Sequence, residues 1–138
     1  MDKALGFMAL ARKAGRIELG EEPVNAATRA VHAPLVIVAK DASDHTWRRG
    51  LSFVAGTSQI CLRVPFTKDE LGFAIGRTSL AIAAFTDPAL ALSFVKALEP
   101  QAAYQESREA LETRVTRLRQ RQKEARNHER NVRKGKKK

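Results

Sequence analysis

Five consecutive apolar residues, Leu35-Val36-Ile37-Val38-Ala39, constrain the fold of this chain more than any other feature. The run follows Pro34, is too short for a helix and is rich in β-branched side chains, so it predicts a β-strand. Successive side chains of a strand point to opposite faces of its sheet. Because all five are apolar, both faces must be covered, as in the central strand of a sheet that has helices on each side.

Strand and helix patterns alternate around this run. Strands are predicted at about residues 16–19, 35–39, 60–64 and 80–85, and helices at about residues 3–14, 20–31, 42–56, 67–76 and 87–100. The clearest helix start is the capping box of Thr67 and Glu70. This alternation predicts the α/β class: a three-layer α/β/α sandwich with a small mixed four-stranded sheet.

Charge divides the chain into two regions. The whole chain carries 25 Lys and Arg against 15 Asp and Glu, a formal charge of +10. Residues 1–99 hold 12 basic and 10 acidic side chains, net +2, whereas residues 100–138 hold 13 and 5, net +8. We therefore expect a near-neutral domain over residues 1–99 and a basic C-terminal extension over residues 100–138, which favours polyanions such as nucleic acid.

The extension predicts a long basic helix. Its apolar residues Tyr104, Leu111, Leu118, Ala125 and Val132 follow a seven-residue line, but charged and amide side chains at the other core positions make a poor coiled coil. We expect the helix to fray before residue 134 and to stay partly ordered until a polyanion neutralises it. One face of this helix carries Arg114, Arg117 and Arg121, which are equally candidates for RNA contacts or for a solvated surface.

No constellation predicts an enzyme, a metal site or a cofactor site. The three His residues lie on separate predicted elements, and Cys61 has no identifiable base. Asp41 and Asp44 are interpreted as strand-end and helix-cap residues rather than a metal pair, and no glycine-rich nucleotide motif is present. A single Cys, with no export signal or membrane span, favours a cytoplasmic protein with no membrane partner, expected by default to be a monomer.

Several motifs resemble a known family. They are Ala9-Leu10-Ala11-Arg12-Lys13-Ala14-Gly15, Leu19-Gly20-Glu21-Glu22, residues 35–43, Leu71-Gly72-Phe73-Ala74-Ile75-Gly76 and Thr86-Asp87. Over about residues 3–98 they resemble the ribosomal-protein family that binds kink-turn RNA, the L-seven-Ae / L-thirty-e group, and particularly its small bacterial ribosomal-protein-like members. The resemblance implies an α/β/α sandwich without enzymatic activity. It also implies that the start of the second helix enters the RNA groove at tandem sheared G·A pairs, while two neighbouring loops hold a flipped-out base.

Carried over by position, the resemblance implies an RNA surface made of four segments. These are Gly20, Glu21, Glu22 and Pro23 at the start of the second helix, Ser43 and Trp47 beside the base pocket, Lys68 at the start of the fourth helix, and the loop of Arg77, Thr78 and Ser79. Each also has an ordinary structural interpretation. Glu21, Glu22 and Pro23 suit a helix start, Trp47 shares an apolar face with Leu51 and Val54, and Lys68 and Arg77 suit a solvated surface.

Two positions depart from the family pattern. The recognition turn reads Glu22-Pro23 where relatives usually have Asn-Glu or a polar pair, and Ala26 stands where many relatives place a Lys that contacts guanine. A lost base contact weakens binding by about 1–3 kcal/mol. The resemblance, together with the basic extension, leads us to expect a non-catalytic, ribosome-associated protein that binds structured, kink-turn-like RNA. The alternative is a protein-interaction adaptor on the same fold that has lost specific RNA recognition.

Overall fold

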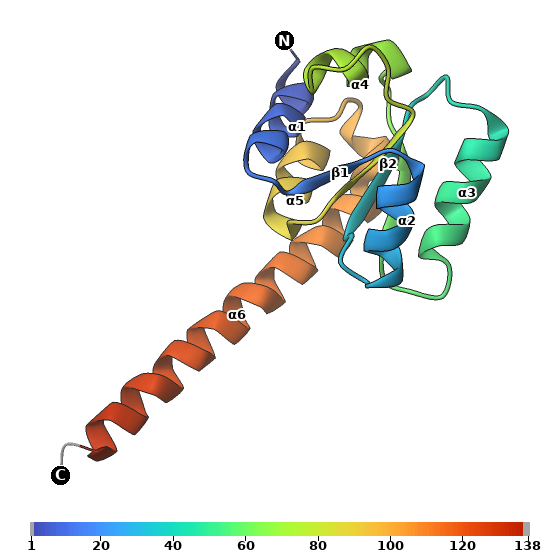
Figure 1. Ribbon diagram of the computed structural model, residues 1–138. Helices are drawn as coiled ribbons and strands as arrows, with labels where there is room; N and C mark the ends of the chain where they lie inside the picture. Colours follow the sequence, from blue (N-terminus) through green and yellow to red (C-terminus); the bar gives the residue numbers. More distant parts are fainter. Residues whose placement is uncertain (1, 137–138) are drawn as a thin grey trace.

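A computed structural model describes the backbone of residues 2–136 and the side chains of residues 2–132 (Figure 1). Its elements, in chain order, are α1 (Lys3–Lys13), β1 (Ile17–Leu19), α2 (Glu21–Arg29), β2 (Leu35–Val38), α3 (Asp44–Val54), β3 (Ile60–Arg63), α4 (Lys68–Ala74), β4 (Ile82–Phe85), α5 (Pro88–Lys96), the short 3-10 helix η1 (Gln101–Tyr104) and α6 (Gln105–Lys136). Each predicted strand and helix of the first 99 residues is present within a few residues of its expected bounds.

The four strands form one mixed sheet in the order β1-β4-β2-β3. β2 runs parallel to β3 and antiparallel to β4, which in turn pairs antiparallel with β1. Every side chain of β2 is buried, so the prediction of a central strand covered on both faces is confirmed.

Helices cover both faces of this sheet (Figure 1). α2 and α3 lie on one face, and α1, α5 and the first turns of α6 lie on the other. The rings of Phe85 on β4 and Phe94 on α5 meet with their centroids 5.0 Å apart, which ties the second helical layer to the sheet. The three-layer α/β/α sandwich predicted from the sequence is therefore confirmed.

The helices begin where the sequence places their caps. The Ser43 hydroxyl accepts a hydrogen bond from the Thr46 amide at 3.2 Å. At α4 the Thr67 hydroxyl accepts from the Glu70 amide, and the Glu70 carboxylate accepts from the Thr67 amide, both at 3.1 Å. These reciprocal bonds satisfy amides that a helix start leaves unpaired, so the predicted capping box is confirmed.

The C-terminal extension is only partly free of the sandwich. Tyr104, Leu111 and Val115 are buried against it, whereas residues 116–132 are exposed all around the helix. Figure 1 shows α6 leaving the body and projecting into solvent. Its backbone is helical through Lys136, so the expected fraying before residue 134 is wrong; basic residues recur through its last turns, where they complement the negative end of the helix dipole. Lys137 and Lys138 lie outside the described residues.

Candidate nucleic-acid interface

One end of the sheet brings together the starts of three helices. β2 and β3 finish there, and α2, α3 and α4 begin there at their N-cap residues Gly20, Ser43 and Thr67; we call it the N-cap end. Backbone bonds hold the segments together. The Gly20 amide donates to the Ile82 carbonyl at 3.0 Å, and the Leu80 amide donates to the Lys68 carbonyl at 3.0 Å. All four predicted RNA-contact segments of the domain therefore lie at one end of the sheet.

Electrostatics at the N-cap end depend on helix ends more than on net charge. Six cationic side chains are balanced by six carboxylates: Lys40, Arg48, Arg49, Arg63, Lys68 and Arg77 against Glu21, Glu22, Asp41, Asp44, Asp69 and Glu70. Asp41 is already engaged, because it accepts a hydrogen bond from the Lys68 amide at 2.8 Å. Side chains likewise cap α3 and α4, whereas α2 has no side-chain cap, so the amides at the start of α2 stay open to a phosphate group.

Glu21 in the first turn of α2 is paired across to α3. Its carboxylate forms a salt bridge with the guanidinium of Arg49. That guanidinium also lies over the ring of Phe53, 5.1 Å from its centroid. Glu21 therefore helps to join α2 to α3, while Glu22 and Pro23 are exposed beside it. Arg49 was not predicted as part of this surface, because only folding brings it to Glu21.

Trp47 is half-buried and packs against the core, as its apolar face predicts. The guanidinium carbon of Arg63, at the end of β3, lies 4.9 Å from the centroid of the indole. Two nitrogens of Arg63, Nε and Nη2, are buried and have no hydrogen-bond partner among the described residues. A base could therefore stack on Trp47 only on surface that Arg63 leaves open, or by displacing Arg63.

Ser43 and Lys68 serve the fold at this end. The hydroxyl of Ser43 caps α3, and the backbone of Lys68 holds both Asp41 and Leu80. The side chain of Lys68 is half-buried, and it forms no salt bridge with any residue that the structure describes.

The loop of Arg77, Thr78 and Ser79 is fully exposed. Gly72 on α4 allows it to approach closely, because a Cβ there would lie 2.7 Å from the Ser79 nitrogen and 2.9 Å from the Arg77 carbonyl oxygen. The Arg77 amide also donates to the Gly72 carbonyl at 2.8 Å. Gly72 was identified in the sequence only as part of a family motif, since no local signal marks which loop will pack on it.

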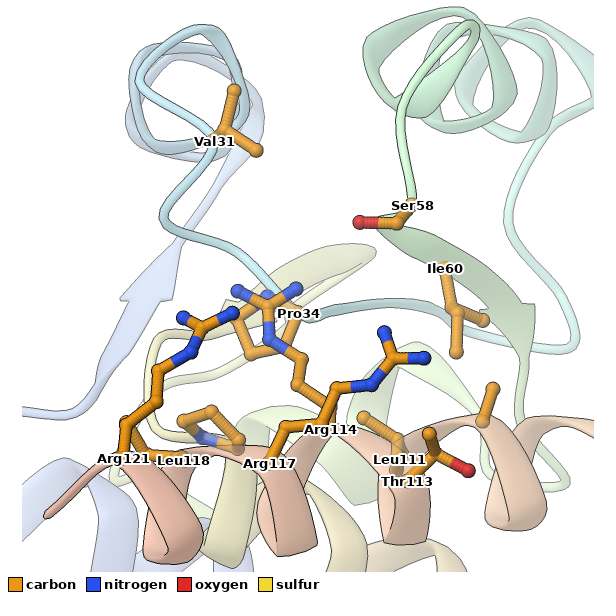
Figure 2. Close-up of a pocket in the computed structure, with 12 residues that line it drawn as sticks. Val31, Pro34, Ser58, Ile60, Leu111, Thr113, Arg114, Arg117, Leu118 and Arg121 are labelled. Atoms are coloured by element: carbon orange, nitrogen blue, oxygen red, sulfur yellow. The ribbon is translucent and has the colours of Figure 1, made fainter. Parts of the chain in front are cut away.

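Arg114, Arg117 and Arg121 lie elsewhere. They project from α6 toward the other end of the sheet, where β2 and β3 begin, and line a cavity of about 380 Å³ that we call the α6 pocket (Figure 2). A four-residue strand is about 13 Å long, so this pocket and the N-cap end are separated by at least the height of the sheet. The predicted contact residues therefore form two surfaces.

The net positive charge of the extension lies beyond its docked part. Residues 100–118 hold three basic and three acidic side chains, whereas residues 119–138 hold ten basic and two acidic ones. The whole net charge of +8 thus belongs to residues 119–138, which begin where α6 has left the body.

The remaining observations concern the thiol of Cys61, possible metal ligands and long helices among the described residues. Burial raises the pKa of the Cys61 thiol to about 12, which keeps it protonated and unreactive at neutral pH. Residues 2–136 contain no group of three His, Cys, Asp or Glu side chains arranged to hold a metal ion. Among the same residues, no helix is both long and apolar enough to cross a membrane.

Comparisons with known proteins find relatives by structure only. Neither the protein-family models nor the curated proteins include a match to this chain. A protein with unknown function from Bacillus halodurans is 29% identical, with a TM-score of 0.64, over 70% of this chain and 96% of that one. A 15.5kD RNA binding protein from Giardia lamblia is 18% identical, with a TM-score of 0.58, over 73% of this chain and 86% of that one. The second likeness shows a shared fold.

Proposed function

We propose that this chain is a non-catalytic RNA-binding protein of the L-seven-Ae / L-thirty-e type. It recognises kink-turn-like RNA through the N-cap end, acts in the cytoplasm and associates with the ribosome or another structured RNA. An RNA-binding neighbour with the same fold supports the choice of ligand. The motifs of the sequence support the choice of family.

The observation that carries this proposal is the convergence at the N-cap end. Segments that are far apart in the chain, residues 20–23, 43–47, 68 and 77–79, meet beside the starts of α2, α3 and α4. At α2 the N-cap residue Gly20 has no side chain to occupy the first amides, which can therefore bind phosphate together with the helix dipole. Polar side chains in the first turns of the three helices can reach base edges. RNA internal loops expose such edges together with unstacked bases.

Because charge is balanced at the N-cap end and positive on the projecting part of α6, these two regions would have different roles. With equal numbers of cations and carboxylates, this end contributes shape and polar contacts rather than long-range attraction. The projecting part of α6 contributes sequence-independent affinity for phosphates, which is screened by salt. The protein would therefore owe its selectivity to the body and much of its overall affinity to the extension.

A titration at one stated salt concentration tests the proposal. A kink-turn RNA and a straight duplex of the same length and base composition are each labelled and titrated with the full chain. Tighter binding of the kink-turn RNA is expected, because only that RNA fits the N-cap end. Equal affinity for both RNAs would refute kink-turn recognition.

An adaptor function is the second candidate, and a groove beside α2 favours it. Pro23, Ala26 and Ala30 line one wall of this open cavity of about 530 Å³, and Arg16 and Glu18 line the other. The small side chains of α2 leave room for the backbone of a protein partner. Failure of the full chain to bind either RNA in the same titration would favour this function.

A further inference from the structure

Hydrogen bonds join the two upper lips of the α6 pocket. Its upper lips in Figure 2 are Val31, after α2, and Ser58, before β3. The side chain of Gln59, only 5% exposed, joins them: its amide nitrogen donates to the Thr28 carbonyl at 3.1 Å, and its amide oxygen accepts from the Ala33 nitrogen at 3.0 Å. A buried side chain thus fixes both lips in place.

Val31 presents an exposed apolar side chain at the cavity. Its φ is +55°, a backbone conformation that β-branched residues rarely adopt, and it is 47% exposed. The C-terminal cap of α2 imposes this conformation, because the Val31 amide donates to the Thr28 carbonyl at 3.0 Å and the His32 amide donates to the Ala27 carbonyl at 2.9 Å. The cap therefore holds an apolar group at the upper lip.

Below these lips, α6 presents a row of arginines. Arg114, Arg117 and Arg121 are spaced three and four residues apart, so they share one helical face and span about 10 Å along the axis. Figure 2 shows all three guanidinium groups pointing into the space under Val31 and Ser58. None forms a salt bridge with a carboxylate of the described chain. Three such groups facing one cavity favour an anionic ligand.

Apolar side chains line the rest of the cavity: Val31, Pro34, Ile60, Pro88, Leu111 and Leu118. A ligand that fits must therefore combine negative charge with a flat or apolar part. The volume of about 380 Å³ lies in the range of sites for single small molecules. It can take one nucleotide, but it is too small for a helix of a protein partner, which is about 10–12 Å across.

We propose that the α6 pocket is a second RNA site, which binds a single-stranded segment flanking the structured RNA. Phosphates of two or three successive nucleotides lie on Arg114, Arg117 and Arg121, and one base inserts between the apolar walls. Guanidinium groups bind phosphate through paired hydrogen bonds and also stack on bases. This inference rests on the proposed RNA-binding function and adds a separate strand-binding site at the opposite end of the sheet.

Two triple variants of the full chain test this site. Arg114→Gln, Arg117→Gln and Arg121→Gln remove the pocket cations. The control, Arg119→Gln, Lys123→Gln and Arg126→Gln, removes the same charge from the opposite face of α6. Each protein is titrated with a labelled ten-nucleotide oligouridine and with the kink-turn RNA, after circular dichroism has confirmed its helix content. The pocket triple is expected to weaken oligouridine binding at least tenfold more than the control triple.

Equal losses in the two triples would overturn the inference, because charge alone would then explain the binding. Competition by decaglutamate as effective as that by unlabelled oligouridine would also overturn it, in favour of an acidic protein partner. Ser58→Trp fills the cavity without changing its charge, and unchanged oligouridine binding by that variant would refute insertion of a base. A wild-type chain without preference for kink-turn RNA, but with pocket-dependent oligouridine binding, would refute the proposed function and leave this site standing.

Discussion

Removal of residues 119–138 is expected to abolish most of the salt dependence of RNA binding and to leave the fold intact. Side chains 119–132 of this segment are exposed, so their removal uncovers no core. The buried contacts of the extension, Tyr104, Leu111 and Val115, all precede the cut. The truncated chain should therefore unfold at nearly the same denaturant concentration as the full chain.

The size of the effect follows from the charge that is lost. The segment holds ten basic and two acidic side chains, net +8. If half of that net charge contacts phosphates, truncation lowers the slope of log K against log salt by about 3. Between 50 and 200 mM salt, the full chain should then lose roughly 60-fold more affinity than the truncated chain.

Fluorescence anisotropy with a straight RNA duplex, repeated at several salt concentrations, measures this slope. Leu111→Ala in the full chain serves as the contrasting variant. It should reduce the free energy of unfolding by about 2–5 kcal/mol, because Leu111 is buried, and leave the slope unchanged. An identical slope for full and truncated chains would refute the assignment of electrostatic affinity to residues 119–138.

Three further outcomes follow from the body. Gly72→Ala should displace the loop at Ser79, lower the free energy of unfolding by about 1–3 kcal/mol in a denaturant titration and weaken kink-turn binding. Gly6→Ala, with open space around it, should lower neither the stability nor the affinity for the kink-turn RNA. Ala26→Lys should strengthen kink-turn binding by about 1–3 kcal/mol in an RNA titration, because it restores the family's base-contacting cation on an exposed turn. Ala30→Lys adds the same charge and should change the affinity for the kink-turn RNA less. Burial raises the pKa of Cys61 from 9.0 to about 12. Above pH 9 the thiol therefore loses its proton in the unfolded chain before it does so in the folded chain, and the free energy of unfolding falls by roughly 1 kcal/mol at pH 10. Cys61→Ala should reduce this alkaline loss of stability when the two unfolding curves are compared.

Local patterns in the sequence predicted the helices and strands because each pattern reflects interactions between residues that are close in the chain. The apolar run of β2 could only be a covered strand, and Thr67 with Glu70 could satisfy the amides of α4 without help from elsewhere. The mixed sheet followed from their alternation. These features depend on neighbours within a few residues, which a sequence displays directly.

Contacts between residues that are far apart in the chain could not be predicted from such local patterns. Arg63 reaches Trp47 only because β3 ends beside the first turn of α3, and Gly72 matters only because a later loop returns to it. The sequence was divided at Pro100, but the net charge of the extension begins at residue 119 and burial continues to Val115. Charge and packing thus change within a few residues of each other, well beyond Pro100, and a count over residues 100–138 as one region did not separate the docked part from the basic part.

Recognition of kink-turn RNA at the N-cap end can be tested most directly through the fluorescence of Trp47. This is the one tryptophan in the chain, and it lies under Arg63 at the predicted site. We expect its emission to change and to saturate at one equivalent of kink-turn RNA. A straight duplex at the same concentration and salt should cause a much smaller change. Binding of the kink-turn RNA that leaves the emission of Trp47 unchanged, or an equal response to both RNAs, would contradict recognition at this end of the sheet.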